Sequence, residues 1–231
     1  GMVRGLSRSS SQARRQAKTR GRLMARQGFL EHLHPPRMEA ERARLRHTFC
    51  LGGLSFLLFM VLGLSGAVLM FHYTPTPQGA ASFFAQEAGA LPFAWFFRRL
   101  HFLAGQAMVI TLILHMVRVL ATGAYLPPRA LNWLVGLILL ALTLALDLSG
   151  YVLRWDEPTK AAATVVAGLI GEIPWLGGLL KRLLLGGDTL GDAALLRFYV
   201  LHCLGLPMLA FMAAMYHFWR IRRDGKATSG L

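Results

Sequence analysis

The stretch that decides the fold is His101-Phe-Leu-Ala-Gly-Gln-Ala-Met-Val-Ile-Thr-Leu-Ile-Leu-His115. The thirteen residues between its two histidines carry no formal charge, and only Gln106 and Thr111 among them are polar. On an α-helix, a spacing of fourteen residues is about four turns. Both imidazoles therefore return to nearly the same face, roughly 21 Å apart along the axis. An ionisable side chain in so apolar a helix is costly and marks a functional position.

A second histidine pair follows in another apolar segment. His202 and His217 are fifteen residues apart, which brings their rings within about 60° of one face. A single histidine in an apolar helix is more often a hydrogen-bonded core residue. Two pairs of matched spacing instead favour four axial ligands to two haems stacked across a membrane. A haem held by two imidazoles has both axial positions filled, so it carries electrons rather than binding oxygen.

The composition supports a membrane protein. The 231 residues are 55% hydrophobic, with a mean hydropathy of +0.46, which is too apolar for an ordinary soluble domain of this size. The net charge of +14 is unevenly spread, because twelve of the 25 Lys and Arg residues precede residue 49 and most others lie at expected helix ends. That distribution is typical of membrane orientation, and we expect no nucleic-acid partner.

The apolar runs predict an all-α, polytopic bundle of four transmembrane helices. The expected spans are 49–71, 94–121, 131–151 and 196–219. Residues 1–45 are expected to form a basic cytoplasmic tail, 46–225 the four-helix domain, and 226–231 a C-terminal tail. Residues 78–93 are expected to be an exterior loop, and the amphipathic connection 152–195 to contain short interfacial helices. Pro207 is expected to kink the fourth span.

Four spans place both termini on the same side of the membrane. That side carries most of the basic residues, so the positive-inside rule predicts a multi-pass protein of the cytoplasmic membrane with both termini cytoplasmic. His101 and His202 then lie at the outer end of the bundle, and His115 and His217 at the inner end.

Four glycines repeat the period of the histidines. Gly52 and Gly66 are fourteen residues apart in the first span, as are Gly136 and Gly150 in the third. Packing of helices through small residues explains any single glycine, but it does not explain the matched period. We therefore expect the first and third spans to approach both haems closely.

Two arginines stand one turn beyond the ligands of the second span. Arg98 precedes His101 by three residues and Arg118 follows His115 by three. Both are placed to pair with haem propionates at the two membrane faces. Anchoring at the membrane interface is the alternative role, and the two are compatible.

The chain resembles the cytochrome b6 family, the short form of cytochrome b in quinol–cytochrome c/plastocyanin reductases. The resemblance runs from Arg46 to Gly225. Besides the two histidine pairs, it is carried by Phe49-Cys-Leu-Gly-Gly53, Thr122-Gly123, Pro128-Arg129, Trp133 with Gly136, Gly150-Tyr151, Trp155-Asp156, Arg197-Phe-Tyr-Val-Leu-His202 with Pro207, and Ile221-Arg-Arg-Asp-Gly225. The fifteen-residue second spacing is also of the b6 type.

This resemblance implies the ligand pairs and the reaction. His101 with His202 would ligate an outer, low-potential b haem, and His115 with His217 an inner, high-potential one. Quinol oxidised at the outer face would send one electron outward and one inward across the haems to an inner quinone site. The chain would supply no catalytic residue of its own and would be inactive alone.

The resemblance also implies partners and a third haem. The partners are a three-helix subunit with a Pro-Glu-Trp-Tyr motif, a Rieske iron–sulfur protein and a c-type cytochrome, in a homodimeric complex. Cys50 matches the family cysteine that forms a single thioether bond to an extra haem. Its plainer interpretation is a small apolar residue in a helix. Cys203 matches no motif and is expected to be a packing residue.

Three departures from the family bear on the outer quinol site. Arg154 stands where the family has a proline, Asp147 where it has a small or apolar residue, and Thr159-Lys160-Ala161 replace bulky aromatic residues. Two other functions stay open from the residues alone. One is a di-haem membrane anchor for another quinone-linked dehydrogenase or reductase, and the other is a small transporter whose histidines bind substrate.

Overall fold

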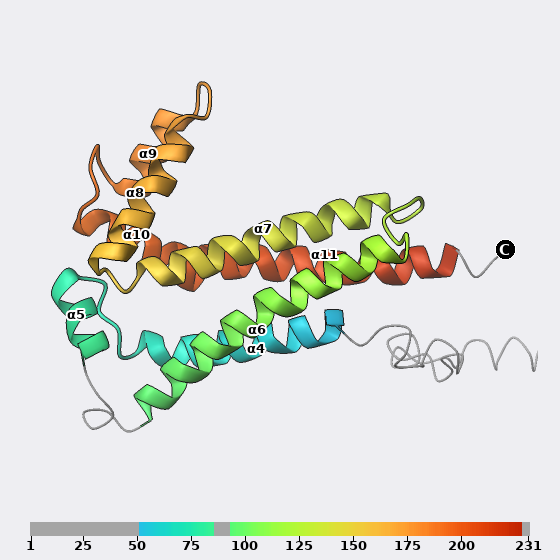
Figure 1. Ribbon diagram of the computed structural model, residues 1–231, viewed down its shortest axis with the longest axis horizontal. Helices are drawn as coiled ribbons and strands as arrows, with labels where there is room; N and C mark the ends of the chain where they lie inside the picture. Colours follow the sequence, from blue (N-terminus) through green and yellow to red (C-terminus); the bar gives the residue numbers. More distant parts are fainter. Residues whose placement is uncertain (1–50, 86–92, 228–231) are drawn as a thin grey trace, which may run out of the picture. The chain divides into compact units, whose positions relative to one another are not determined.

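The structure is a computed structural model that describes residues 51–85 and 93–227, the last four of them without side chains. Every element of regular structure in these ranges is helical (Figure 1), which confirms the all-α prediction. In chain order the elements are α4 (Leu51–Met70), α5 (Pro77–Ala85), α6 (Ala94–Ala121), α7 (Ala130–Val152), α8 (Glu157–Gly171), α9 (Gly177–Leu185), α10 (Asp192–Val200), the π-helical turn η1 (Leu201–Gly205) and α11 (Leu206–Ala227).

Four of these helical stretches are long and apolar enough to cross a membrane. They are α4, α6, α7 and the continuous stretch Asp192–Arg223, which joins α10, η1 and α11. Most of their large apolar side chains are exposed on the chain, whereas the two buried residues of α4 are serines, Ser55 and Ser65. Small polar residues at helix contacts and apolar ones outside are the arrangement expected in lipid. The four predicted spans are therefore confirmed.

The spans associate as two helix pairs. Helix α4 packs chiefly on α6, and α7 packs chiefly on α11, while contacts between the two pairs are sparse. Figure 1 shows α4 running alongside α6, and α7 alongside α11. In each pair, one helix carries the periodic glycines, and the other, α6 or α11 with the preceding turn η1, carries two of the four histidines.

The main apolar core lies at one end of the spans, where the short helices gather (Figure 1). It joins the end of α7 to residues of α5, α8, α9 and α10, among them Ala80, Val152, Ala163, Leu185 and Leu195. The hydroxyl of Tyr73 donates to the carbonyl of Leu153 over 2.7 Å and ties the end of α4 to this core. Burial first, and then neighbouring Cys203 and Tyr199, raise the pKa of Tyr73, so its hydroxyl stays a donor.

Part of the expected exterior loop is a helix. Pro77 begins α5, and the side-chain oxygen of Thr76 accepts a hydrogen bond from the backbone N–H of Gly79 at 3.0 Å. Proline at the first helical position and threonine at the N-cap are strong start signals. Residues 86–92 of the same loop lie outside the described ranges.

The connection 152–195 contains the short helices that its amphipathic sequence predicts. Asp156 caps α8 through a 3.1 Å hydrogen bond from the backbone N–H of Thr159, and Pro158 follows in the first turn. The guanidinium of Arg154 lies 2.7 Å from the Asp156 carboxylate. Arg154, which replaces a proline of the resembling family, thus pairs with Asp156, which matches that family, at the start of α8.

The fourth span contains a π-helical turn rather than uninterrupted α-helix. The backbone N–H of Leu206 donates to the carbonyl of Leu201, five residues back, and Pro207 follows at the start of α11 without a donor of its own. A π turn absorbs one additional residue within an α-helix. It begins next to His202, so the fifteen-residue spacing to His217 becomes nearly equivalent to the fourteen-residue spacing in α6. The widened turn accommodates the missing backbone N–H of Pro207.

Candidate functional site

Each of the four histidines lies against one of the four periodic glycines. On α4, Gly66 faces His101 and Gly52 faces His115, whereas on α7, Gly150 faces His202 and Gly136 faces His217. A Cβ atom added to the glycine would lie 2.7 Å from the ring Cε1 at Gly150, 3.1 Å at Gly66, 3.4 Å at Gly52 and 3.7 Å at Gly136. The shared period therefore seats the histidine rings directly on the neighbouring helix.

We call His101 and His202 the outer pair, and His115 and His217 the inner pair, after the sides of the membrane that the sequence predicts for them. The outer histidines face each other across the two helix pairs. The ring centroids of His101 and His202 are 6.1 Å apart, and the ring planes are inclined at 74°. Two imidazoles bonded through nitrogen at about 2 Å to opposite sides of one metal have ring centroids roughly 6 Å apart. The outer pair therefore already stands at the separation that a shared iron requires.

The hydrogen bonds of the outer pair involve Nδ1 of each ring and leave Nε2 without a protein partner among the described residues. His202 Nδ1 lies 3.0 Å from the carbonyl oxygen of Leu146 and 3.1 Å from Ser149 Oγ. Since a carbonyl only accepts, Nδ1 carries the proton and Nε2 has a free lone pair. This arrangement is typical of histidines that bind a metal, because the second hydrogen bond sets the tautomer and the ring orientation.

His101 is oriented by a serine in the same way. Its Nδ1 lies 2.9 Å from Ser65 Oγ, and Ser65 donates its own proton to the carbonyl of Val61 at 2.7 Å. Because a hydroxyl has one proton, Ser65 accepts from Nδ1–H of His101. The Nε2 atom of His101 is then also a lone-pair donor.

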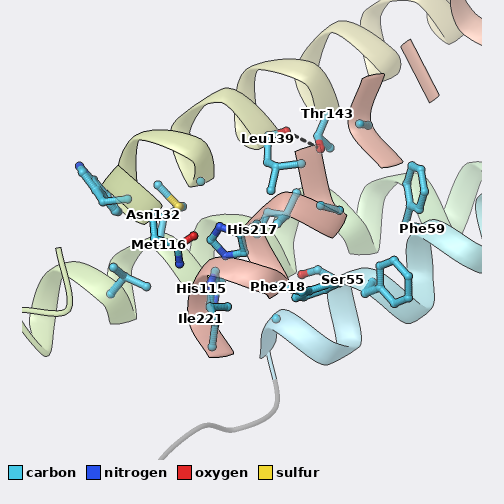
Figure 2. Close-up of a pocket in the computed structure, with 18 of the residues that line it drawn as sticks. Ser55, Phe59, His115, Met116, Asn132, Leu139, Thr143, His217, Phe218 and Ile221 are labelled. Atoms are coloured by element: carbon cyan, nitrogen blue, oxygen red, sulfur yellow. Dashed lines mark hydrogen bonds between the residues drawn. The ribbon is translucent and has the colours of Figure 1, made fainter. Parts of the chain in front are cut away.

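The inner histidines share a cavity of about 310 Å³ (Figure 2). Its volume lies within the range of ligand-binding pockets in proteins. The walls come from all four spans, and His115 and His217 enter it from α6 and α11. The other polar or small residues at its surface include Gly52, Ser55, Arg129, Asn132, Gly136 and Thr143. The cavity thus continues the space between the two helix pairs.

Two polar atoms of the inner site lack a protein partner. His217 Nδ1 and Asn132 Oδ1 are buried without a hydrogen bond among the described residues, although the Asn132 backbone interacts with the His217 ring. Buried polar groups are nearly always paired. Unpaired atoms at a cavity wall fit a site that a polar or metal-bearing ligand completes.

The described residues contain no group of three or more His, Cys, Asp or Glu side chains that could hold a metal ion. The histidines come instead as two pairs, and each ring lies against a glycine. Two axial ligands suit an iron whose other positions a macrocycle fills. The backbone of a glycine lets a flat ring approach closely. The residues present therefore fit haem better than a bare ion.

The remaining predicted site residues are placed differently. Arg98 donates to the carbonyl of Phe83 at 2.9 Å and lies over the rings of Phe83 and Phe84, while Arg118 lies within electrostatic range of His115. Their pairing with propionates stays a prediction. Cys50 lies outside the described residues.

Sequence reasoning missed Ser65 and Ser149. Each directly precedes one of the outer glycines, as Ser65-Gly66 and Ser149-Gly150. That repeated dipeptide was the available signal, because a residue next to the glycine reaches the edge of the same ring. The role of the Leu146 carbonyl had no signal in the side-chain pattern.

Comparisons with known proteins agree with this site. The profile of the family described as Cytochrome b/b6/petB matches residues 39–225. Cytochrome b6 of Gracilaria tenuistipitata var. liui is 38% identical over 177 residues, which cover 77% of this chain and 82% of the relative. Cytochrome b6 of Chlamydomonas reinhardtii is 36% identical over 177 residues, which again cover 77% of this chain and 82% of the relative.

A solved structure shows the same likeness. A chain of a hyperthermophilic respiratory Complex III superposes with a TM-score of 0.67 and 25% identity. The match covers 77% of this chain and 48% of the solved one, so the chain spans about half the length of that protein. Taken with the two histidine pairs, these likenesses mean that the chain belongs to the cytochrome b/b6 family, the multi-pass electron-transfer subunits of bc- and b6f-type quinol oxidoreductases.

Proposed function

We propose that His101 with His202 and His115 with His217 hold two b-type haems, and that the chain carries electrons between the two membrane faces. Family membership implies b-type haems, and the four histidine–glycine seats are the observation that carries the assignment. A bis-imidazole haem, when bound, accepts and donates one electron. The protein's part is to present four Nε2 atoms at two depths and to exclude water between them.

The orientation of the outer rings supports rapid electron exchange. His202 and His101 are each held by a neighbouring helix, through Leu146 and Ser149 in one case and Ser65 in the other. Ligands fixed in this way move little when the charge at the site changes. Little reorganisation is what an electron carrier requires.

We place a further haem and a quinone site beside the inner cavity, next to the haem proposed for His115 and His217. Cys50 is two residues before Gly52, which lines this cavity, and Asn132 offers an unpaired carbonyl oxygen there. We assign Cys50 a thioether bond to an extra haem, as the family motif implies. Peptide from denatured protein is expected to retain haem in the wild type and to lose it in Cys50→Ser. Cys203→Ser, the matched control, should keep it.

The catalytic complex has further subunits. The proposed partners are the Pro-Glu-Trp-Tyr subunit, a Rieske protein and a c-type cytochrome, with quinol oxidised near the His101–His202 end. Arg98 and Arg118 would pair with propionates. Both termini would be cytoplasmic, with residues 1–45 and 226–231 as tails around the 46–225 domain.

Single histidine replacements test the proposal. We expect His101→Ala or His202→Ala to remove one b haem from the visible spectrum, and His115→Ala or His217→Ala to remove the other. His72→Ala is the matched control, because His72 lies exposed just beyond α4 and should leave both haems. A colourless wild-type protein, or a ligand variant that retains two low-spin haems, would contradict the assignment.

A further inference from the structure

Asp147 is an acidic side chain on the face of α7 that points between the helix pairs. It is the one acidic residue in α4, α6 and α7 as the structure describes them. It follows Thr143 by four residues and precedes Gly150 by three, so it shares their face of the helix. A Cβ atom on Gly105 of the facing helix α6 would lie 3.9 Å from Asp147 Oδ1.

Gly105 places this carboxylate relative to the histidines. It follows His101 by four residues, so it lies on the histidine face of α6, one turn toward His115. Asp147 therefore occupies the space between the outer and inner histidine pairs. Its carboxylate is nearer to the outer pair, because about 4.5 Å of helix separate it from Gly150 and about 16.5 Å from Gly136.

Within the described ranges, no residue pairs with Asp147 through a hydrogen bond or an ion pair. A charged side chain within a membrane span is costly, and it normally faces a partner of opposite charge. The oxidised form of the outer haem site has one more positive charge than the reduced form. The oxidised outer haem site would therefore be the group of opposite charge that lies near Asp147.

We propose that the carboxylate of Asp147 lowers the reduction potential of the outer haem site relative to the inner one. The inference rests on the two-haem function proposed above. A negative charge favours the oxidised state of a nearby redox centre, and its effect falls with distance. Because Asp147 is closer to the His101–His202 pair, it makes the outer site the better donor and drives electrons inward.

Redox titration of the visible spectrum of the assembled complex tests this inference. We expect Asp147→Asn to raise the outer midpoint potential about twice as much as the inner one. The equilibrium constant for moving an electron from the outer to the inner site should fall roughly fourfold, as for one charge on the order of 10 Å from the outer site and on the order of 20 Å from the inner site at an effective dielectric constant near 20. Asp147→Glu keeps the charge and should behave as wild type, as should Asp192→Asn at the exposed start of α10.

Moving the carboxylate to the facing helix gives the most specific test of its charge. In the double variant G105D/D147N, a carboxylate returns to nearly the same place from the facing helix, and it should restore the low outer potential. If Asp147→Asn loses the outer haem, Asp147→Ser is the second neutral variant. If both lose it and G105D/D147S does not restore it, the side chain acts through packing and the proposal is overturned.

The other outcomes separate this proposal from the one before it. A wild-type protein without two haems contradicts the proposed function itself. Two haems with unchanged midpoint potentials in both neutral variants overturn only the role of Asp147. Unchanged potentials together with slower quinol oxidation also overturn it, and they would assign the carboxylate to proton transfer instead.

Discussion

At the scale of single residues, the site depends on four glycines, whose lack of a side chain leaves room for the histidine rings. The four glycines differ in how closely they approach their histidines, from 2.7 Å at Gly150 to 3.7 Å at Gly136 for an added Cβ atom. Alanine in a helix interior is intrinsically better than glycine by roughly 0.5–1 kcal/mol. The sign of a Gly→Ala change therefore depends on whether the adjacent ring has room to move.

Gly150→Ala is expected to displace the His202 ring and weaken the outer haem. Overpacking at such a contact costs about 1–3 kcal/mol, which exceeds the helix gain. Gly136→Ala, with an ordinary contact to His217, should keep both haems and leave stability unchanged or slightly higher. Haem content from the visible spectrum and thermal unfolding in detergent measure both variants. Equal effects of the two changes would show that the glycines act through general helix packing.

At the scale of elements, the π turn η1 reconciles two unequal spacings. His202 and His217 are fifteen residues apart, and His101 and His115 are fourteen apart, yet each pair presents its rings at two matching depths. The additional residue is absorbed between Leu201 and Leu206, where the hydrogen bond spans five residues.

Deletion of exposed Leu204 should therefore be tolerated. The π turn would close to an α turn, and His217 would keep its direction relative to His202. Deletion of Ile110, an equally exposed residue of α6, is the matched control. With no π turn to close, it should rotate His115 by about 100° relative to His101 and remove a haem. Counting b haems in the visible spectrum decides; loss of haem on deletion of Leu204 alone would refute the explanation.

The N-cap of α8 supplies a second prediction for an element. Asp156→Ala should lower stability by about 1 kcal/mol, because it leaves the backbone N–H of Thr159 without its acceptor. Asp156→Asn should retain most of the stability, since asparagine also caps helices. Thermal unfolding of the purified protein in detergent compares the three chains.

The same cap predicts a dependence on pH. Slight burial raises the pKa of the Asp156 carboxyl, but the hydrogen bonds from Thr159 and then the charge of Arg154 more than offset it, and the pKa is lowered. The carboxylate therefore stabilises the folded protein at pH values above 3.8, the ordinary pKa of an aspartate. This contribution is lost as the pH falls through the lowered pKa. The difference between wild type and Asp156→Ala should disappear on that acidification, and a difference that grew there would contradict the assignment.

At the scale of the whole molecule, the short helices α5, α8 and α9 gather at the His101–His202 end, and the turn between α6 and α7 lies at the other. Trp175 is fully exposed between α8 and α9, and Thr122 is exposed in the opposite turn. The proposed orientation places Trp175 outside the cell and Thr122 inside.

Cysteine labelling tests that orientation. A membrane-impermeant maleimide should label Trp175→Cys in intact cells, and Thr122→Cys only after the membranes are opened. The parent chain is the control, because its Cys50 and Cys203 lie in apolar segments. Labelling of Thr122→Cys in intact cells would contradict the proposed orientation.

The sequence by itself determined the four spans, their bounds to within a few residues, and the four histidines with their glycines. These are local or periodic properties, because hydropathy decides what lipid accepts and a helix repeats every 3.6 residues. The same reasoning placed short helices in the 152–195 connection, although it expected a loop where Pro77 and Thr76 begin α5.

Only the tertiary structure decided which glycine faces which histidine, how much room each ring has, and which nitrogen of each outer ring is hydrogen-bonded. Those facts depend on contacts between helices that are far apart in the chain, such as Ser65 with His101 and Leu146 with His202. The π turn also needed the structure, because a change from four-residue to five-residue hydrogen bonding leaves almost no trace in the side-chain pattern. Asp147 shows both limits at once: the sequence marked it as a charge in a span, and the facing Gly105 placed it between the histidine pairs.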